Sequence, residues 1–263
     1  MFDLPTRRFF SITLINIFKT NLQNKKKDIP LFYSTDITST SVTLNEEESW
    51  HCIKVLRLKS GDEALIIDGC GGFYKAEITD PHPKKCILKI NDTKKEFNKR
   101  KSRLHLAIAP TKNSDRFDWF IEKATELGID EITPFTAQHS ERISIKEDRI
   151  KRVMITAAKQ SVKAFLPKVN PMTPFTDLLK TEFKGDKFIA HCHQGFDKKH
   201  ILECCQKEKN TLILIGPEGD FTNEEITQAL ECGFVSVSLS QSRLRTETAA
   251  LMATALINGI NLT

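Results

Sequence analysis

Short, mostly apolar stretches recur through the second part of the chain and are separated by longer segments with helical spacing. These stretches predict buried strands over residues 104–109, 131–135, 187–190, 212–215 and 234–239. Residues 115–127 repeat apolar positions at helical spacing and end at Gly128, and residues 147–165 form a second predicted helix. Because strands alternate with helices, we predict an α/β fold with a mostly parallel sheet and helices on both faces.

The preceding part, residues 29–100, has shorter apolar segments and more turn residues. It predicts a short helix over 46–56 and strands over residues 64–67, 73–78 and 86–90. Asp68–Gly72 is a glycine-rich hairpin loop between the first two strands, and because no helix follows it, a phosphate-binding loop is excluded. The pattern by itself indicates a small β barrel or sandwich.

The segment TLILIGPEGDFTNEEI, residues 211–226, joins a buried strand to a glycine-bracketed loop and a helix start. Gly216 and Gly219 lack a Cβ, so the backbone can turn sharply and approach a ligand closely. Thr222 and Glu225 form a capping-box pattern that predicts a helix from about Asn223. Ligands bind beyond the carboxyl ends of strands in open α/β sheets, so the loop is a candidate site. An ordinary strand–turn–helix connection is the alternative.

The segment LRTETAALMATALI, residues 244–257, predicts an almost wholly apolar helix from about Thr246. Such a helix must be buried on more than one side. This is explained either by a second subunit or by a central position in the core. Arg245 and Glu247 enter this apolar context charged, which is typical of functional or paired residues.

Several separated segments resemble one family, the bacterial ribosomal RNA uridine-N3 methyltransferases of the SPOUT superfamily of knotted enzymes. The two signature loops are IGPEGDF at 215–221 and LRTETAAL at 244–251. Residues 51–78 resemble the family's N-terminal domain, and 123–135 and 159–167 resemble further blocks of its catalytic domain. The resemblance covers about residues 30–263, with the segments in the family's order.

The resemblance implies a trefoil-knotted SPOUT domain over residues 101–263, preceded by a PUA-like, RNA-binding β-barrel domain over 29–100. It also implies methylation of N3 of a uridine in 16S ribosomal RNA, with S-adenosylmethionine as cofactor and a homodimer as the active form. The residues expected to hold the cofactor are Ala190, His191, Ile215, Gly216, Pro217, Glu218, Gly219, Leu239, Ser240 and Leu244.

The expected catalytic residues are Arg245, which would stabilise charge on the uracil oxygens, and Glu247. Either Glu247 or Glu218 could accept the N3 proton, and the sequence does not choose between them. The expected RNA contacts are Lys112, Arg116, Arg142 and Arg243, with solvated surface charge as the alternative.

The chain departs from the family pattern at several positions. Ser240, Ser242 and Arg243 stand where the family usually has glycine, arginine and an aliphatic residue. Lys159 replaces the usual glutamate before Gln-Ser, Lys163 replaces an arginine, and Asp220 replaces the second glycine of the first loop. These changes leave the cofactor loop plausible and affect the residues that face the RNA.

Length and charge agree with this division. A chain of 263 residues favours two domains. The net charge of +5 lies mostly in residues 1–30, which hold six basic and two acidic residues, a balance of +4. We expect residues 1–28 to be an extension outside the conserved fold. Residues 94–103 (KKEFNKRKSR) are either a solvated linker or an RNA-contacting strip.

The remaining composition bears on location and metals. Seven scattered cysteines favour a reducing cytoplasm over a disulfide framework. No apolar run is long enough to span a membrane, so no membrane partner is expected. The spacing of His191, His193, Cys204 and Cys205 does not match a zinc site, and we expect no metal.

Two other functions are compatible with the same sequence. One is a non-catalytic RNA-binding or ribosome-assembly factor, and the other is a SPOUT methyltransferase that acts on transfer RNA. Binding of S-adenosylmethionine separates the first from an enzyme. Nucleoside analysis of ribosomal RNA from a deletion strain separates the second from a ribosomal RNA methyltransferase.

Overall fold

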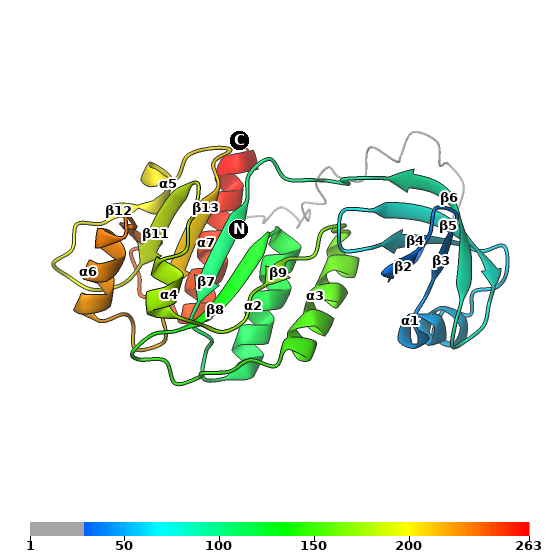
Figure 1. Cartoon of the computed structure of the whole chain (residues 1–263), viewed down its shortest axis with the longest axis horizontal. Helices are drawn as coiled ribbons and strands as arrows, with labels where there is room; N and C mark the ends of the chain where they lie inside the picture. The colour runs from blue at the N-terminus through cyan, green and yellow to red at the C-terminus, as the bar shows by residue number, and fades with distance from the viewer. Residues whose placement is uncertain (1–28, 263) are drawn as a thin grey trace, which may run out of the picture.

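The computed structural model describes residues 29–262 and contains two separate β-sheets joined by one stretch of chain (Figure 1). The extension expected at residues 1–28 lies outside the described residues. Among residues 29–262, no helix is both long and apolar enough to cross a membrane.

The first sheet has six strands in the order β1-β4-β5-β6-β3-β2. β1 pairs parallel with β4, and the other pairs are antiparallel. The predicted helix over 46–56 is a short α-helix that continues as a π-helical turn. The elements are β1 (Leu31–Tyr33), β2 (Asp36–Ile37), β3 (Ser41–Thr43), α1 (Glu46–Trp50), η2 (His51–Val55), β4 (Glu63–Ile67), β5 (Phe73–Asp80) and β6 (Ile87–Lys94).

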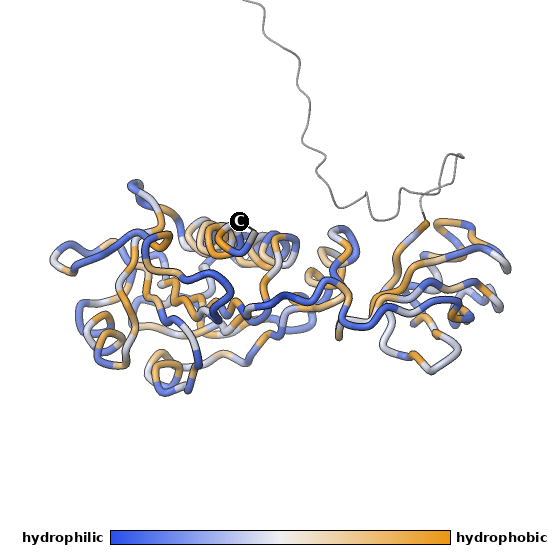
Figure 2. The backbone as a smooth tube through the Cα atoms, turned by 90° about the horizontal axis from the view of Figure 1, so that it is seen from above, coloured by the Kyte–Doolittle hydropathy of each residue, from blue (hydrophilic) through white to orange (hydrophobic). Residues whose placement is uncertain are grey.

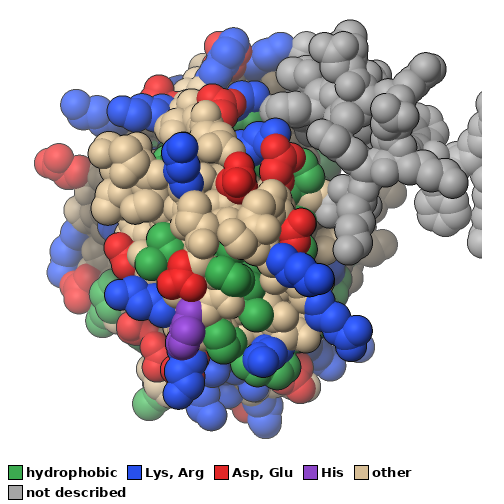
Figure 3. Space-filling model, turned by 90° about the vertical axis from the view of Figure 1, so that its right-hand side faces the viewer, with side chains coloured by type: hydrophobic (Ala, Val, Ile, Leu, Met, Phe, Trp, Pro, Cys, Tyr) green, Lys and Arg blue, Asp and Glu red, His purple; other side chains and the backbone are tan. Residues whose placement is uncertain are grey.

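Alternate residues of this sheet face two different apolar clusters. Ala64 and Ile66 point into the domain's own core, where they pack with Phe32 and Leu88. Ile67 instead belongs to a cluster that includes Ala158 and Ala164 from the second part of the chain. Because side chains alternate along a strand, β4 supplies one face to its own core and the other to the neighbouring domain. On the outer end of this domain, basic and acidic side chains are interspersed (Figure 3).

The hairpin loop between β4 and β5 packs against Phe165 of the second domain. A Cβ at Gly71 would lie 2.2 Å from Cζ of Phe165. The backbone continues the contact, because Gly71 N donates to Ala164 O (2.9 Å) and Leu166 N donates to Gly69 O (2.9 Å). Lys159 Nζ also donates to Oε1 of the buried Glu48 at 2.6 Å. The glycine cluster therefore makes room for close contact between the domains.

The chain between the sheets, which includes the basic strip 94–103, is largely hydrophilic (Figure 2). Three of its basic residues contact the second domain. Arg100 donates to Gly128 O and lies 3.4 Å from Asp130, Lys101 Nζ lies 2.7 Å from Glu208 Oε1, and Arg103 pairs with Glu131. These contacts favour the linker interpretation of the strip over an RNA-contacting surface.

The second sheet is wholly parallel, in the order β10-β8-β7-β13-β11-β14-β12, with β9 also paired to β8. Its strands are β7 (Leu104–Ile108), β8 (Glu131–Thr136), β9 (Lys168–Val169), β10 (Thr173–Pro174), β11 (Asp186–Ala190), β12 (Lys199–His200), β13 (Thr211–Ile215) and β14 (Val235–Ser238). Its helices are α2 (Ser114–Leu127), α3 (Glu147–Ser161), α4 (Phe175–Leu179), α5 (Ile201–Cys204), α6 (Asn223–Glu231) and α7 (Thr246–Leu262).

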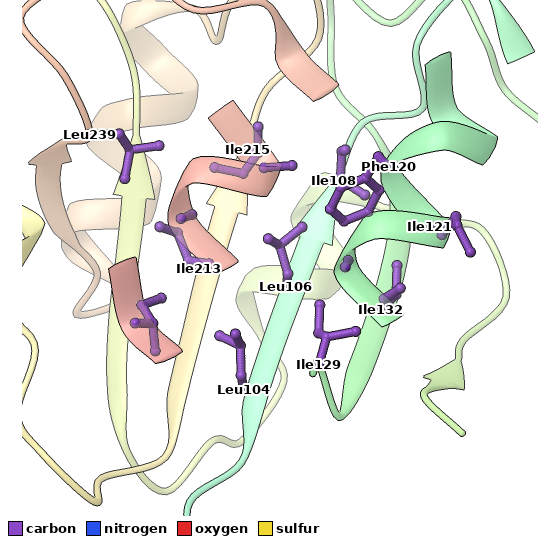
Figure 4. Packing of buried hydrophobic residues seen from close by; sticks show 14 of the residues in the cluster. Leu104, Leu106, Ile108, Phe120, Ile121, Ile129, Ile132, Ile213, Ile215 and Leu239 are labelled. Atoms are coloured by element: carbon purple, nitrogen blue, oxygen red, sulfur yellow. The ribbon is translucent and has the colours of Figure 1, made fainter. Parts of the chain in front are cut away.

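Helices cover both faces of this sheet, as predicted. Leu106 and Ile213 face a core that includes buried residues of α2, α3, α5 and α7. Figure 4 shows these side chains between the central strands and the helices. Leu212 and Leu214 face the opposite core, which includes buried residues of α4 and α6. The central strands are apolar on both sides for this reason.

The helix predicted over residues 147–165 ends earlier, and that boundary was wrong. Val162 adopts a left-handed conformation (φ +55°) that closes α3 after Ser161. Residues 163–167 leave the helix, and Phe165 packs on the glycine loop of the first domain. Sequence periodicity cannot reveal this end, because the competing contact comes from a distant part of the chain.

We predict that Gly71→Ala weakens the contact between the domains, because the added Cβ would overlap the Phe165 ring. Overpacking of this kind costs about 1 to 3 kcal/mol, measurable by urea denaturation. Gly61→Ala is the matched control, since Gly61 also has a positive φ (+89°) but no atom lies within 4 Å of its added Cβ. Equal stability losses in the two variants would show that only backbone strain matters. Adding Phe165→Ala to the Gly71 variant should recover part of the difference.

Candidate functional site at the carboxyl edge of the parallel sheet

Three adjacent strands end at the same edge of the second sheet. In the register of the sheet, Ala190 of β11 lies beside Ile215 of β13 and Val237 of β14. Because the strands are parallel, the loops that follow them all emerge at this edge. The loops carry the sequence-predicted cofactor residues of all three segments, at 190–191, 215–219 and 239–244.

The loop after β13 is a tight turn held by its own backbone. Gly216 and Pro217 are buried, whereas Glu218 and Gly219 are exposed. Asp220 N donates to Pro217 O at 2.9 Å, which closes the turn. The predicted capping box is present, with Thr222 and Glu225 bonded reciprocally at the start of α6. This cap fixes where the loop ends and the helix begins.

The two glycines of this loop face protein rings. A Cβ at Gly216 would lie 2.9 Å from the Phe221 ring, and a Cβ at Gly219 would lie 2.9 Å from Cβ of His139. From the sequence, their missing side chains are expected to let the backbone approach a ligand closely. In the structure, an added Cβ at either glycine would meet a neighbouring protein segment, so the missing side chains also let these segments approach each other closely.

Asp220 makes contacts in this loop that were not expected from the sequence, where it stands out only as a replacement for a glycine of the family pattern. Its backbone is left-handed, with φ +62°. Its carboxylate accepts from Phe221 N at 2.9 Å and from Cys192 N at 2.8 Å, and its carbonyl oxygen lies 3.0 Å from Nδ1 of His139. Asp in place of the glycine usual in the resembling family was the sequence signal that could have revealed it, because Asp is one of the few other residues that tolerate a positive φ.

His191 lies directly after β11 and is buried, with its Nε2 3.0 Å from Ser236 Oγ and its ring against Phe196. Its Nδ1 is buried and has no hydrogen-bond partner among the described residues. Burial, together with the charge of Lys198, lowers the pKa of His191 to about 4. The imidazole is therefore neutral near pH 7 and offers one unused ring nitrogen.

The loop after β14 has an apolar side and a basic side. Leu239 is buried and Leu244 is half-buried against the same core. Ser240 Oγ accepts from Ser242 N at 3.1 Å, which holds the turn. Arg243 and Arg245 are exposed. The loop therefore presents both predicted arginines to solvent at the edge where the other loops emerge.

Glu247 lies in the first turn of α7 and is only 7% exposed. Its Oε1 is 3.8 Å from Nε of Arg116, and its Oε2 is buried without a hydrogen-bond partner among the described residues. The helix N-terminus favours a carboxylate at this position. A buried carboxylate oxygen without a partner is costly and marks a functional candidate.

The other predicted RNA contacts lie on segments at the same edge. Lys112 follows β7 and is exposed; its Nζ is 2.7 Å from Glu141 Oε2, and its backbone N donates to Glu218 Oε1 at 3.0 Å. The hydrogen bond that the Lys112 ammonium donates to Glu141 raises the pKa of Lys112. Arg142 follows β8 and lines a cavity of about 110 Å³ beside α2 and α3. Arg116 lies on α2 and faces Glu247.

A larger cavity of about 310 Å³ lies beside this edge, between β8, α4 and α6. Its lining includes Gln138, Thr176 and Gln228, and none of the predicted cofactor residues lines it. The cofactor loops are therefore distinct from this cavity. Among residues 29–262, no three His, Cys, Asp or Glu side chains are grouped so as to hold a metal ion.

Two domain families match the chain. Residues 98–258 match a family described as RNA methyltransferase domain, and residues 44–91 match one described as RNA methyltransferase PUA domain. A ribosomal RNA small subunit methyltransferase E from Mesomycoplasma hyopneumoniae is 33% identical over 217 residues, which cover 81% of this chain and 89% of that protein.

Solved structures agree with these matches. A crystal structure of a probable rRNA-methyltransferase from Porphyromonas gingivalis has a TM-score of 0.84 and 37% identity, covering 89% of this chain and 99% of its own. A ribosomal RNA small subunit methyltransferase E from Neisseria gonorrhoeae, bound to S-adenosyl methionine, has a TM-score of 0.78 and 26% identity, covering 89% and 98%.

We predict a pH-dependent contribution of His191 to stability. Its pKa falls from the ordinary 6.5 to about 4 on folding, so the unfolded chain binds more protons between these values. The contribution is therefore complete above about pH 6.5 and is lost as the pH falls toward 4. Between these limits the free energy of unfolding should drop more steeply than in His191→Gln, by up to about 1.4 kcal/mol per pH unit.

Urea denaturation across this pH range measures both slopes, and His82→Gln, at an exposed position, is the control. Parallel slopes for wild type and His191→Gln would contradict the burial of a neutral imidazole.

Proposed function

The chain belongs to the family of RNA methyltransferases whose methyltransferase domain follows a PUA domain, and we propose that it methylates RNA of the small ribosomal subunit with S-adenosylmethionine as methyl donor. More specifically, we propose that the methyl group is transferred to N3 of a uridine in 16S ribosomal RNA, in the cytoplasm. It is supported by relatives named ribosomal RNA small subunit methyltransferase E and by the bound S-adenosyl methionine of one structural neighbour. We assign residues 29–100 to RNA binding and 101–263 to methyl transfer.

The observation that carries this proposal is the convergence of three loops at one edge of a parallel sheet. Backbone groups of residues 215–219 and 239–244, together with Ala190 and His191, would hold S-adenosylmethionine. The residues fit such a ligand, because the buried Nδ1 of His191 has no hydrogen-bond partner among residues 29–262 and Leu239 and Leu244 supply apolar surface. S-adenosylmethionine supplies a methyl group that is already activated on its sulfonium.

The chain's own residues must then orient the uracil and take its N3 proton. Arg245 is exposed at the start of α7, where a guanidinium can stabilise charge that develops on the uracil oxygens. Its carbonyl oxygen accepts from Ala249 N at 2.7 Å, so its backbone is fixed by the helix. Arg245 is therefore proposed as the residue that stabilises the transition state.

For the proton acceptor, the structure favours Glu247 over Glu218. Glu218 is exposed, and its Oε1 already accepts from Lys112 N. Glu247 is buried two residues after Arg245, and its Oε2 has no hydrogen-bond partner in the part of the chain that the structure describes. Arg116 lies beside it and compensates part of its charge. We therefore propose Glu247 as the acceptor, with Arg116 as its neighbour rather than an RNA contact alone.

RNA binding is proposed for the basic residues around the same edge. Arg243 is exposed on the loop after β14, and Lys112 and Arg142 follow β7 and β8. Contacts from such side chains to phosphates position the RNA without reading its sequence. Lys112 must exchange its partner Glu141 for a phosphate. Arg243 is also exposed, and no ion pair with another described residue has to break before it can contact a phosphate.

A homodimer is proposed from the surface of α7. Ala250, Ala253 and Ile257 are buried in the monomer, whereas Leu251 and Met252 remain partly exposed and Ala255 is exposed. An apolar helix covered on one side only is typical of an interface. Because Arg245 and Glu247 lie on either side of Thr246, the first residue of α7, a partner on this helix would also border the proposed catalytic residues.

We predict that Arg245→Ala retains S-adenosylmethionine binding and loses methyl transfer by about two to three orders of magnitude, because one preorganised charge contact is removed. Calorimetry measures the binding, and methyl incorporation into small ribosomal subunits with nucleoside analysis measures the transfer and its position. Arg243→Ala should instead raise the KM for RNA. An Arg245→Ala enzyme at full rate would contradict the role of Arg245.

The same assays on the wild-type chain test the substrate. A product other than N3-methyluridine would contradict methylation at N3, and modified transfer RNA would contradict the ribosomal substrate.

We predict that Met252→Glu yields monomers or insoluble protein without methyl transfer, because it places a charge on a partly exposed apolar position of α7 that also packs against the core of the domain. Light scattering measures the association state. Lys151→Glu is the control, since it introduces the same side chain at an exposed position on α3. An active monomer would show that the interface lies elsewhere.

A further inference from the structure

Asp220 joins three of the loops that emerge at the carboxyl edge of the sheet. Its carboxylate Oδ2 accepts from Cys192 N, which belongs to the loop after β11, at 2.8 Å. Its carboxylate Oδ1 accepts from Phe221 N within its own loop at 2.9 Å. Its carbonyl oxygen meets Nδ1 of His139, on the loop after β8, at 3.0 Å. One residue therefore connects segments from β8, β11 and β13.

The loop after β11 depends on charged side chains for its shape. Residues 191–198 contain no helix or strand. Lys198 Nζ donates to His193 O at 2.7 Å and contacts His191 O at 3.4 Å, so one ammonium group holds two carbonyl oxygens of the loop together. The Asp220 carboxylate accepts from the N–H of Cys192, the residue between His191 and His193. Lys198 binds the carbonyl oxygens of this loop and Asp220 binds its Cys192 N–H, so together they fix the backbone that follows His191.

The conformation of Asp220 separates its two contributions. A φ of +62° is open to glycine at no cost and is tolerated by Asp and Asn. Glycine would preserve the turn, because the bond from residue 220 N to Pro217 O needs only backbone. Glycine would remove the carboxylate that reaches Cys192. The carboxylate is thus a feature added to the turn and not required for it.

We propose that Asp220 is a positioning residue of the methyltransferase site: its carboxylate holds the loop after β11 against the loop after β13 in the conformation that binds S-adenosylmethionine. This inference rests on the proposed function of the two loops. Asp220 acts through the backbone of Cys192 and does not contact the reacting atoms. Without the carboxylate, the loop samples other conformations, and cofactor binding must include the cost of ordering it.

The proposal predicts a specific split between binding and rate. Asp220→Gly keeps the turn and should weaken S-adenosylmethionine binding by about tenfold, the effect of losing a hydrogen bond to a charged group. The KM for S-adenosylmethionine should rise equally, while kcat at saturating cofactor stays within about twofold of wild type, because Arg245 and Glu247 are untouched. Asp220→Asn keeps the left-handed backbone and an acceptor oxygen, so it should recover part of the loss.

The test uses the full chain, calorimetry with S-adenosylmethionine and methyl incorporation into small ribosomal subunits. Amide hydrogen exchange adds a direct reading, because the Cys192 N–H should lose protection in Asp220→Gly while the amides of α6 keep theirs. Asp197→Gly is the matched control, since it removes the same charge from an exposed position on the loop after β11.

Each outcome decides the proposal. Weaker binding with a preserved kcat and an exposed Cys192 amide supports it. Wild-type affinity in Asp220→Gly, an equal loss in Asp197→Gly, or a loss confined to kcat overturns it while the proposed function stands. If the wild-type chain itself does not bind S-adenosylmethionine, the proposed function fails, and this inference fails with it.

Discussion

The parallel register of the second sheet is the constraint on which the site depends. Strands β11, β13 and β14 are distant in the chain but lie side by side with their carboxyl ends aligned. Apolar residues on both faces of the strands hold this alignment, because helices cover the sheet on either side. The loops after these strands lie close together without secondary structure of their own, because the aligned strands all end at one edge of the sheet.

Charged side chains then shape the loops that the sheet brings together. Asp220 and Lys198 fix the loop after β11, and the capping box of Thr222 and Glu225 fixes the start of α6. Glu225 also accepts from Gln138 N at 2.8 Å, which ties the loop after β8 to the same helix. Polar contacts thus hold the segments at this edge, in contrast to the apolar contacts that hold the sheet.

The two domains are joined by complementary shapes as well as by charge. Phe165 occupies the space that Gly71 leaves open, and Lys159 Nζ donates to the buried Glu48. Both partners from the second domain lie at or just beyond the end of α3, which stops at Ser161 so that the chain can turn toward the first domain.

The sequence by itself determined the α/β order of elements, the glycine loop after β13, the capping box and the apolar helix α7. Each follows from spacing between neighbouring residues, which local propensity and periodicity encode. It also pointed to Arg245 and Glu247, because charge in an apolar segment is visible without coordinates.

Only the tertiary structure decided the partners of the glycines, the early end of α3, the unpaired oxygen of Glu247 and the contact from Asp220 to Cys192. Contacts such as those of Gly219 with His139 and of Asp220 with Cys192 join residues that are far apart in the chain, and no local pattern records which side chain fills a given space. The sequence therefore specified the elements and their chemistry, and packing between distant segments determined which groups meet at the site.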